Sequence, residues 1–361
     1  MTDEITKIWS NAAGQSVFRR KHTKSDGRHV LLYGNSVPDQ ALVAKGLEAA
    51  PTASELRWHP LRQEWSVYSA GRQSRTFKPG RADDPLAPTR QGGPETEIPF
   101  STFEVAVFEN RFPCLVRDAD WKGAATTATQ TRPATGNCEV VVYTDAPEGC
   151  LADLPLSRRE LLVRTWIDRY RELFEAGCAT VIPFENRGDE VGVTLHHPHG
   201  QIYGFDFIPP VQAAAVDAFN KGFDLAAGLR DWKEDYEICG AGGLAAFAPP
   251  FARYPYEVWI APLERRRGPW EFSDEEVSGL ADLLGEVTCR LDKFFNRPCP
   301  YMLSLQAAPK SAGASFHFTV QIYPILRAPN RLKYFATIEH ATNVFTVDVL
   351  PEQTVIELRN L

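Results

Sequence analysis

The second half of the chain repeats the order of structural signals found in the first half. In each half a strand-like segment precedes a long amphipathic helix, and a strand-like segment containing Gln-Ile-Tyr follows that helix. The tripeptide stands at 201–203 and at 321–323, and the helices begin near Ser157 and Ser273. Because similar spacing over several elements is typical of an internal duplication, we predict two tandem repeats. Chance recurrence of the tripeptide is the alternative.

Each repeat is predicted to contain one long helix. Ser157 and Ser273 each stand three positions before a glutamate, which is the pattern of a capping box at a helix start. Apolar residues recur at helical spacing after both serines, and Gly177 is a typical helix stop. We therefore predict helices over 157–176 and 273–295.

Short strands alternate with these helices, so the sequence favours an α+β fold. Residues 1–55 are polar and are predicted to form an N-terminal extension, part of it packed on the body. The two repeats would then occupy 56–210 and 211–361. The predicted strands are 64–68, 103–108, 138–143, 179–183, 197–203, 244–248, 256–260, 301–305 and 316–323.

The densest group of histidines contains the row His197-Pro198-His199-Gly200-Gln201. On a strand, residues two apart point to the same side, so the two imidazoles and the carboxamide are predicted to share one face. Pro198 cannot donate to a neighbouring strand, which indicates an edge or the mouth of a site. Gly200 lets a phosphate approach the backbone closely.

His199, at the centre of this row, is a candidate nucleophile. A neutral imidazole can attack phosphorus and form a phosphoramidate, provided that an acceptor holds the proton on its far nitrogen. Gln201 can exchange hydrogen bonds but cannot protonate a leaving group or activate water. The pair therefore suits an intermediate that waits for a second substrate. A metal-binding or buried histidine cluster is the alternative.

The second repeat lacks this nucleophile. When the two copies are aligned on Gln-Ile-Tyr, His317 matches His197, but Thr319 takes the place of His199. We therefore predict one chemical centre per chain, with the second repeat in a structural or substrate-holding role.

Composition argues against several classes of protein. With 361 residues, 43% of them hydrophobic, the chain is long enough for two domains with cores of their own. A net charge of -7 argues against a general nucleic-acid binder, and no apolar run reaches the length of a membrane span. Seven cysteines, an odd number without a Cys-x-x-Cys pair, fit reduced thiols. Because the start also lacks a signal-peptide pattern, we expect a cytoplasmic protein.

The histidine row, preceded by Glu185-Asn186-Arg187-Gly188, resembles the active-site signature of the galactose-1-phosphate uridylyltransferases, a branch of the histidine-triad superfamily. The resemblance implies two tandem histidine-triad-like repeats with antiparallel sheets, each a half-barrel with one long helix. It also implies that His199 takes a uridylyl group from UDP-glucose and passes it to galactose 1-phosphate, a double displacement in galactose metabolism. Adenylyl transfer with ADP-sugars or diadenosine polyphosphates, and nucleotide binding without catalysis, remain alternatives.

The same resemblance implies substrate contacts in the first repeat. Arg72 and Arg75 match two arginines that contact phosphates, although a solvated surface pair is the alternative for this spacing. Asn110 and Phe112 match residues of the nucleoside pocket. Arg111 stands where some relatives have an aspartate, so the ribose contacts are expected to differ.

Further contacts are implied in later segments. Asn186 and Thr194 match positions near the phosphates, and Lys333 and Glu339 match residues that reach the hexose phosphate and hexose hydroxyls. In the family, the C-terminal segment that carries the residues matching Lys333 and Glu339 enters the partner subunit's site. The resemblance therefore implies a homodimer.

Metal binding is where the sequence departs most from the family. Many relatives hold zinc with Cys-x-x-Cys and two histidines, one of them at the position of His197. Here the cysteine pair falls on Asp84-Pro-Leu-Ala87, and alanine cannot ligate a metal. No cofactor is predicted to be required. Zinc binding, with His197, Asp84 and Cys138 as candidate ligands, remains open. The family also has a second metal site, and the residues at its positions in this sequence are poor ligands, so iron is not expected.

Overall fold

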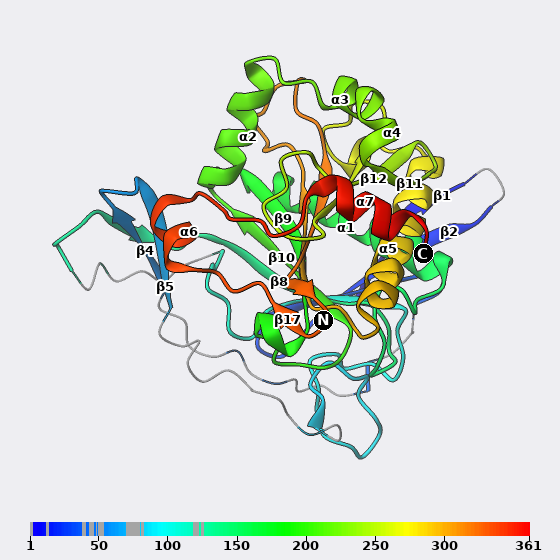
Figure 1. Cartoon of the computed structure of the whole chain (residues 1–361). Helices are drawn as coiled ribbons and strands as arrows, with labels where there is room; N and C mark the ends of the chain where they lie inside the picture. Colours follow the sequence, from blue (N-terminus) through cyan, green and yellow to red (C-terminus); the bar gives the residue numbers. More distant parts are fainter. Residues whose placement is uncertain are drawn as a thin grey trace. The chain divides into compact units, whose positions relative to one another are not determined.

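The computed structural model describes residues 3–11, 14–37, 41, 42, 47, 49, 54–69, 80, 83–117, 123 and 126–361 (Figure 1). The chain divides into two compact units, each made of three separate segments. The first unit comprises 1–149, 164–183 and 194–214, and the second comprises 150–163, 184–193 and 215–361. The domain boundaries drawn from the sequence, after residues 55 and 210, stay a prediction.

The strands of the first unit are β1 (Glu4–Ser10), β2 (Ser16–Thr23), β3 (His29–Gly34), β4 (Ser54–His59), β5 (Glu64–Ser69), β6 (Val105–Glu109), β7 (Thr131–Pro133), β8 (Gly136–Val142), the start of β9 (Thr180–Arg187) and β10 (His199–Phe205). The main sheet runs in the order β1-β2-β3-β6-β8-β10-β9, and a smaller sheet has the order β5-β4-β7. Strand β8 is buried along its whole length, because its apolar residues are covered on both faces of the sheet.

Within the predicted N-terminal extension, β1, β2 and β3 continue the main sheet through the pairing of β3 with β6. These three strands were not among those predicted from the sequence. Val30 and Leu32 of β3 pack with Phe108 and Val140 in the core of this unit. The consecutive basic residues Arg19, Arg20 and Lys21 of β2 hid these strands in the sequence. The apolar run of β3 was the signal that could have revealed them.

Helix α1 (Leu156–Glu175) begins one residue before the predicted start, and the predicted capping box is wrong. Ser157 lies inside the first turn, and the amide of Arg158 donates to the carbonyl of Pro155 at 2.9 Å. Pro155 therefore takes the capping position predicted for Ser157. The stop at Gly177 is confirmed by its φ of 100°, which is the left-handed conformation of a helix C-terminus.

The second unit contains β11 (Glu237–Ala241), β12 (Leu244–Phe247), β13 (Val258–Pro262), β14 (Tyr301–Gln306), β15 (Thr319–Pro324), β16 (Leu326–Ala328), β17 (Arg331–Leu332), most of α2 (Pro210–Asn220), α3 (Leu225–Asp231), α4 (Lys233–Tyr236), α5 (Asp274–Phe295), α6 (Thr337–Thr342) and α7 (Pro351–Arg359). Its sheet has the antiparallel order β14-β15-β13-β12-β11. Helix α5 packs on β11, β12 and β13 through a buried apolar stripe.

The two units share one order of elements. The first has the sheet order β6-β8-β10-β9, with α1 after β8 in the sequence, and the second has β12-β13-β15-β14, with α5 after β13. A duplication would produce this correspondence, although the duplication and the half-barrel curvature stay predictions. The predicted α+β class with antiparallel sheets and long helices is confirmed.

The capping box of α5 is confirmed, and it allows a matched test of helix capping. The amide of Glu276 donates to Ser273 Oγ at 3.1 Å, and the amide of Ser273 donates to the Glu276 carboxylate at 2.8 Å. We expect Ser273→Ala to lower the free energy of unfolding by about 1 kcal/mol. Ser157→Ala, in the first turn of α1 but outside a cap, should change it by less than about 0.5 kcal/mol. Equal losses in urea denaturation would contradict this assignment.

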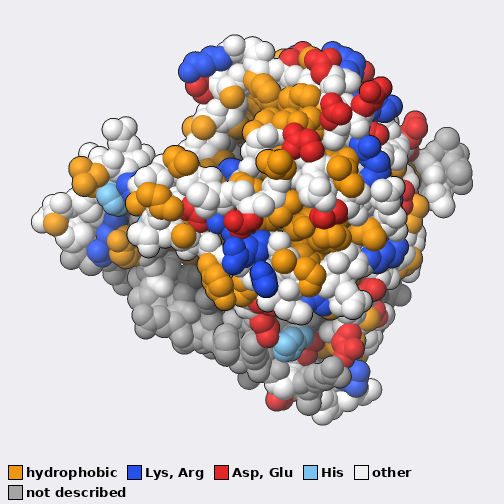
Figure 2. Space-filling model, in the orientation of Figure 1, with side chains coloured by type: hydrophobic (Ala, Val, Ile, Leu, Met, Phe, Trp, Pro, Cys, Tyr) orange, Lys and Arg blue, Asp and Glu red, His pale blue; other side chains and the backbone are white. Residues whose placement is uncertain are grey.

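Charges of both signs lie among apolar side chains on the face drawn in Figure 2. Exposed apolar residues of the C-terminal segment include Leu350 and Ile356. Within the part of the chain that the structure describes, no helix combines the length and apolarity needed to cross a membrane.

Candidate active site

His199 and Gln201 lie on one face of β10, as the alternation predicts. Both side chains are half-buried, whereas Gly200 and Ile202 between and after them are buried on the opposite face. The strand starts at His199, so His197 lies in the bend before it and is not part of the strand. The backbone of β10 is held by β8, in the register that pairs His199 with Val142.

The ring of His199 is oriented by a backbone carbonyl. Its Nδ1 lies 2.7 Å from the carbonyl oxygen of His197. A carbonyl only accepts, so Nδ1 carries the proton and donates it. The Nε2 atom is therefore left with a free lone pair, which is the form needed to attack phosphorus. The carbonyl of Pro198, between the two histidines, instead accepts from the amide of Tyr143 at 3.1 Å.

The electrostatic surroundings keep this imidazole neutral. Burial lowers the pKa of His199, and nearby His197 lowers it further, against the opposing effects of the backbone hydrogen bond and of Asp84. Desolvation disfavours the cation because the charged ring loses more hydration than the neutral one. The nucleophilic form thus persists to lower pH than in a free histidine.

An open pocket with about 670 Å³ of unfilled space lies beside these two side chains. All of its lining residues belong to the first unit. They are Pro85, Leu86, Glu97, Phe108, Asn110, Arg111, Phe112, Val140, Thr194, Leu195, His199 and Gln201.

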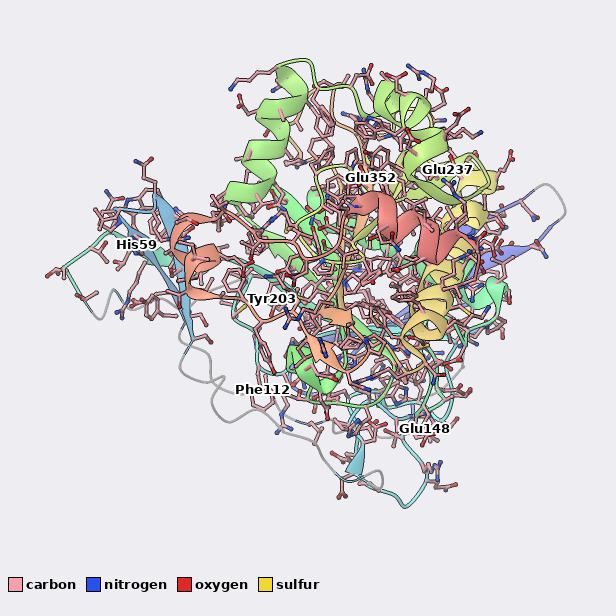
Figure 3. All side chains as sticks on the ribbon, viewed as in Figure 1. His59, Phe112, Glu148, Tyr203, Glu237 and Glu352 are labelled. Atoms are coloured by element: carbon pink, nitrogen blue, oxygen red, sulfur yellow. The ribbon has the colours of Figure 1, made fainter. Side chains whose placement is uncertain are left out.

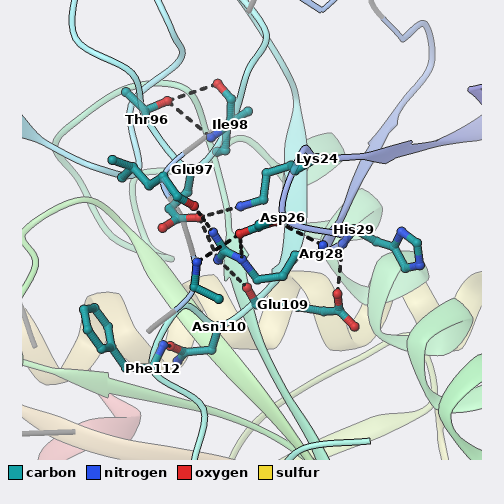
Figure 4. Close-up of polar contacts among 12 residues, drawn as sticks. Lys24, Asp26, Arg28, His29, Thr96, Glu97, Ile98, Glu109, Asn110 and Phe112 are labelled. Carbon is teal, nitrogen blue, oxygen red and sulfur yellow. Dashed lines mark hydrogen bonds and ion pairs between the residues drawn. The ribbon is translucent and has the colours of Figure 1, made fainter. Parts of the chain in front are cut away.

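Asn110 and Phe112 enter this pocket from the turn after β6. The Oδ1 atom of Asn110 accepts the amide of Phe112 at 2.8 Å, which leaves the Asn110 NH₂ group as a donor (Figure 4). The Arg111 guanidinium lies 5.3 Å from the centre of the Phe112 ring. Phe112 and Tyr203, the latter on the same face of β10 as His199, are labelled in Figure 3. The pocket thus offers a ring face, an amide donor and a cation.

A buried ionic cluster, which no sequence pattern indicated, supports the pocket wall. Glu97 accepts from Lys24 Nζ at 2.6 Å and from Arg28 Nη1 at 2.9 Å (Figure 4). Burial lowers the pKa of Lys24, although Glu97 opposes this effect. Arg28 Nη1 also donates to the carbonyl of Glu109 at 3.0 Å, directly before Asn110. The cluster therefore fixes the turn that carries the pocket amide.

The remaining predicted residues fall in three places. Thr194 lines the pocket, whereas Arg72 and Arg75 lie outside the described residues. Asn186 belongs to the second unit, where it lies opposite Met302 in the β9–β14 pairing.

Lys333 and Glu339 form an ion pair with each other in the second unit. The Lys333 ammonium and the amides of Ala336 and Thr346 lower the pKa of Glu339 to about 2. In this conformation both oxygens of the Glu339 carboxylate accept hydrogen bonds from residues of its own segment.

His197 is a poor metal ligand in this arrangement. Its Nδ1 lies 2.7 Å from Asp84 Oδ2 and its Nε2 lies 2.7 Å from the carbonyl oxygen of Thr144. Both ring nitrogens are therefore engaged, and neither has a lone pair directed at a cation. Among the described residues, no three His, Cys, Asp or Glu side chains gather as a metal site would require.

Comparisons with known proteins agree with this fold and with the family that the histidine row indicates. The family model described as galactose-1-phosphate uridyl transferase, N-terminal domain, matches residues 47–209. A galactose-1-phosphate uridylyltransferase of Thermotoga maritima is 36% identical over 84% of this chain and 98% of its own length. One from Streptomyces lividans is 32% identical over 79% of each chain.

A solved structure titled as that of a uridylyltransferase aligns with a TM-score of 0.76 at 29% identity, over 85% of this chain and 97% of that one. The fold and the site thus define a nucleotidyltransferase of the uridylyltransferase class. The chain belongs to the galactose-1-phosphate uridylyltransferase family. The family inferred from the histidine row is confirmed.

Proposed function

We propose that the protein transfers UMP from UDP-glucose to galactose 1-phosphate through a uridylyl-histidine intermediate. The observation that carries the proposal is the hydrogen bond from His199 Nδ1 to the His197 carbonyl, which leaves Nε2 as a neutral nucleophile at the pocket. The names of the relatives support the substrates.

In the first step, the lone pair of His199 Nε2 attacks the α-phosphorus of UDP-glucose. A phosphorus–nitrogen bond forms, the bond to the bridging oxygen breaks, and glucose 1-phosphate leaves with that electron pair. The ring becomes cationic, and the His197 carbonyl stabilises this charge through the Nδ1 proton. In the second step a phosphate oxygen of galactose 1-phosphate attacks the same phosphorus, and Nε2 leaves with its lone pair restored.

Gln201 stands next to the nucleophile on the same strand face. Its NH₂ group can donate to the non-bridging oxygens of the transferred phosphoryl group, where negative charge gathers. A carboxamide has no proton to give to a leaving group and no basicity with which to activate water. The intermediate is therefore protected from hydrolysis until the second substrate arrives.

The pocket would receive the nucleoside and its phosphates. Phe112 offers a face for the base and Asn110 a donor for the pyrimidine or ribose. Arg72 and Arg75 would contact the phosphates, with Thr194 as a further donor.

The contacts to the hexose, the assembly and the cofactor state complete the proposal. Asn186 would lie near the phosphates, and Lys333 and Glu339 would take the hexose phosphate and hydroxyls of a partner subunit's substrate, in a homodimer. No metal is required for the chemistry, and His197 serves as a hydrogen-bonding residue. None of the seven cysteines forms a disulfide, which supports a reducing, cytoplasmic compartment.

The proposal is tested by trapping the intermediate. Incubation with UDP-glucose labelled in the uridylyl group should leave one label per chain on His199, located by peptide mass spectrometry under alkaline conditions. ADP-glucose, the matched donor for the alternative adenylyl transfer, should leave little. Label from ADP-glucose alone would favour adenylyl transfer, and no label from either donor would favour a nucleotide-binding protein.

The lowered pKa of His199 predicts the pH dependence of its uridylylation. Protonation removes the lone pair of Nε2, so the rate should fall as the pH drops through the pKa of the folded protein. Because burial lowers that pKa from 6.5, the acid limb of the single-turnover rate should lie below pH 6.5, with a plateau above it. An acid limb above this value in a stopped-flow pH profile would contradict the assigned surroundings of His199.

A further inference from the structure

A chain of hydrogen bonds leads from Asp84 to the nucleophile. Asp84 Oδ2 lies 2.7 Å from His197 Nδ1, and the Thr144 carbonyl lies 2.7 Å from Nε2 on the other side of the ring. The His197 side chain is fully buried, so these two contacts fix the orientation of the ring. The backbone carbonyl of the same residue then accepts the proton of His199 Nδ1.

We propose that Asp84 is a positioning residue for His199, acting through His197. The inference rests on the proposed function, because it assigns Asp84 a task in the same reaction. Holding the His197 ring at both nitrogens prevents the bend before β10 from rotating. The carbonyl that orients the nucleophile is thereby kept in place. Hydrogen bonds thus orient the His197 ring, as bonds to a metal ion orient the rings of many metal-binding histidines.

Asp84 also connects the nucleophile to the pocket wall. Its Oδ1 atom accepts the amide of Leu86 at 2.9 Å, and Pro85 and Leu86 line the pocket. Burial raises the pKa of Asp84, but hydrogen bonds from His197 and Leu86 outweigh this effect and lower it. One carboxylate therefore ties the wall of the pocket to the segment that carries His199.

The second unit provides an internal comparison. His317 stands two residues before β15, as His197 stands two residues before β10. Its Nε2 lies 2.8 Å from the carbonyl of Pro262, but its buried Nδ1 finds no hydrogen-bond partner among the described residues. Strand β15 begins with Thr319, which cannot act as an imidazole nucleophile. The carboxylate is thus present in the unit that carries the nucleophile, and the unit without a nucleophile retains only the carbonyl contact.

The experiment measures single-turnover uridylylation by UDP-glucose in the full-length protein. We expect Asp84→Ala to lower the maximal rate by about 10- to 100-fold, because a displacement of about 1 Å at a nucleophile has effects of this size. The UDP-glucose concentration for half-maximal rate should change by less than about threefold. Asp84→Asn should restore most of the rate, since its oxygen can accept from Leu86 while its NH₂ group donates to His197 Nδ1 of the neutral ring.

Asp83→Ala is the matched control, because Asp83 is the exposed neighbour of Asp84. It should react at the wild-type rate. A wild-type rate for a folded Asp84→Ala, or a loss in Asp84→Asn as large as in Asp84→Ala, would overturn the proposal. Thermal melting identifies variants that have merely unfolded. A rate lost on dialysis against a chelator and restored by zinc would also overturn it. Absence of any adduct in the wild type would instead count against the proposed function.

Discussion

His199→Ala is expected to lower uridylyl transfer by about 10⁴-fold or more, because it removes the atom that forms the covalent bond. The measurement is the exchange of label between UDP-glucose and glucose 1-phosphate, which requires only the first half-reaction and its reversal. Alanine at this position leaves the pocket and Gln201 in place, so UDP-glucose should still bind. The expected loss therefore lies in the maximal rate, with little change in the affinity for UDP-glucose.

His196→Ala provides the matched control for this experiment. His196 belongs to the same histidine cluster but is exposed, and the structure gives it no part in orienting His199. Its variant should exchange label within about twofold of the wild-type rate. Exchange by His199→Ala at more than about a hundredth of the wild-type rate would exclude a mechanism in which this imidazole carries the uridylyl group.

The largest loss of stability is expected for Glu139→Ala. Glu139 lies on β8 and accepts two hydrogen bonds from Arg169 of α1, at 2.9 and 2.7 Å. Both side chains are almost fully buried. Removing the carboxylate therefore leaves a buried guanidinium whose anionic partner among the described residues is Glu172. Removing one member of such a pair lowers the free energy of unfolding by about 3 to 5 kcal/mol. Urea denaturation measures this loss.

Two further variants test whether the expected loss of stability comes from the burial of the Glu139–Arg169 pair or would follow the loss of any ion pair. Asp217→Ala breaks an exposed pair with Lys221 and should change the free energy of unfolding by less than about 1 kcal/mol. Replacing both Glu139 and Arg169 by leucine removes the two charges together and should cost less than Glu139→Ala alone. A loss for Glu139→Ala as small as that for Asp217→Ala would contradict the buried pairing.

Local patterns in the sequence predicted most of the regular structure that carries the site. The alternation along β10, the helix stop at Gly177 and the capping box at Ser273 were all predictable, because each depends on residues a few positions apart. The same kind of pattern misled at Ser157, where Pro155 supplies the capping carbonyl. A capping motif indicates that a helix begins nearby, but it does not determine which residue takes the cap.

The contacts that organise the site could not be predicted in this way. Glu97 and its two cationic partners come from segments far apart in the chain, and the sequence marks none of them as members of a cluster. The β3 strand was missed because its neighbour β2 is rich in charge, although tertiary pairing places both in the main sheet.

The sequence by itself was enough to predict the family, which the comparisons confirm, and to propose a chemical centre. In a strand, the order His197-Pro198-His199-Gly200-Gln201 places an imidazole and a carboxamide two positions apart on one face. Only the tertiary structure decided which nitrogen of His199 is free and what holds His197. The ring of His197 meets Asp84, 113 positions away in the sequence. Contacts of that kind depend on the path of the folded chain, and neither residue spacing nor composition encodes them.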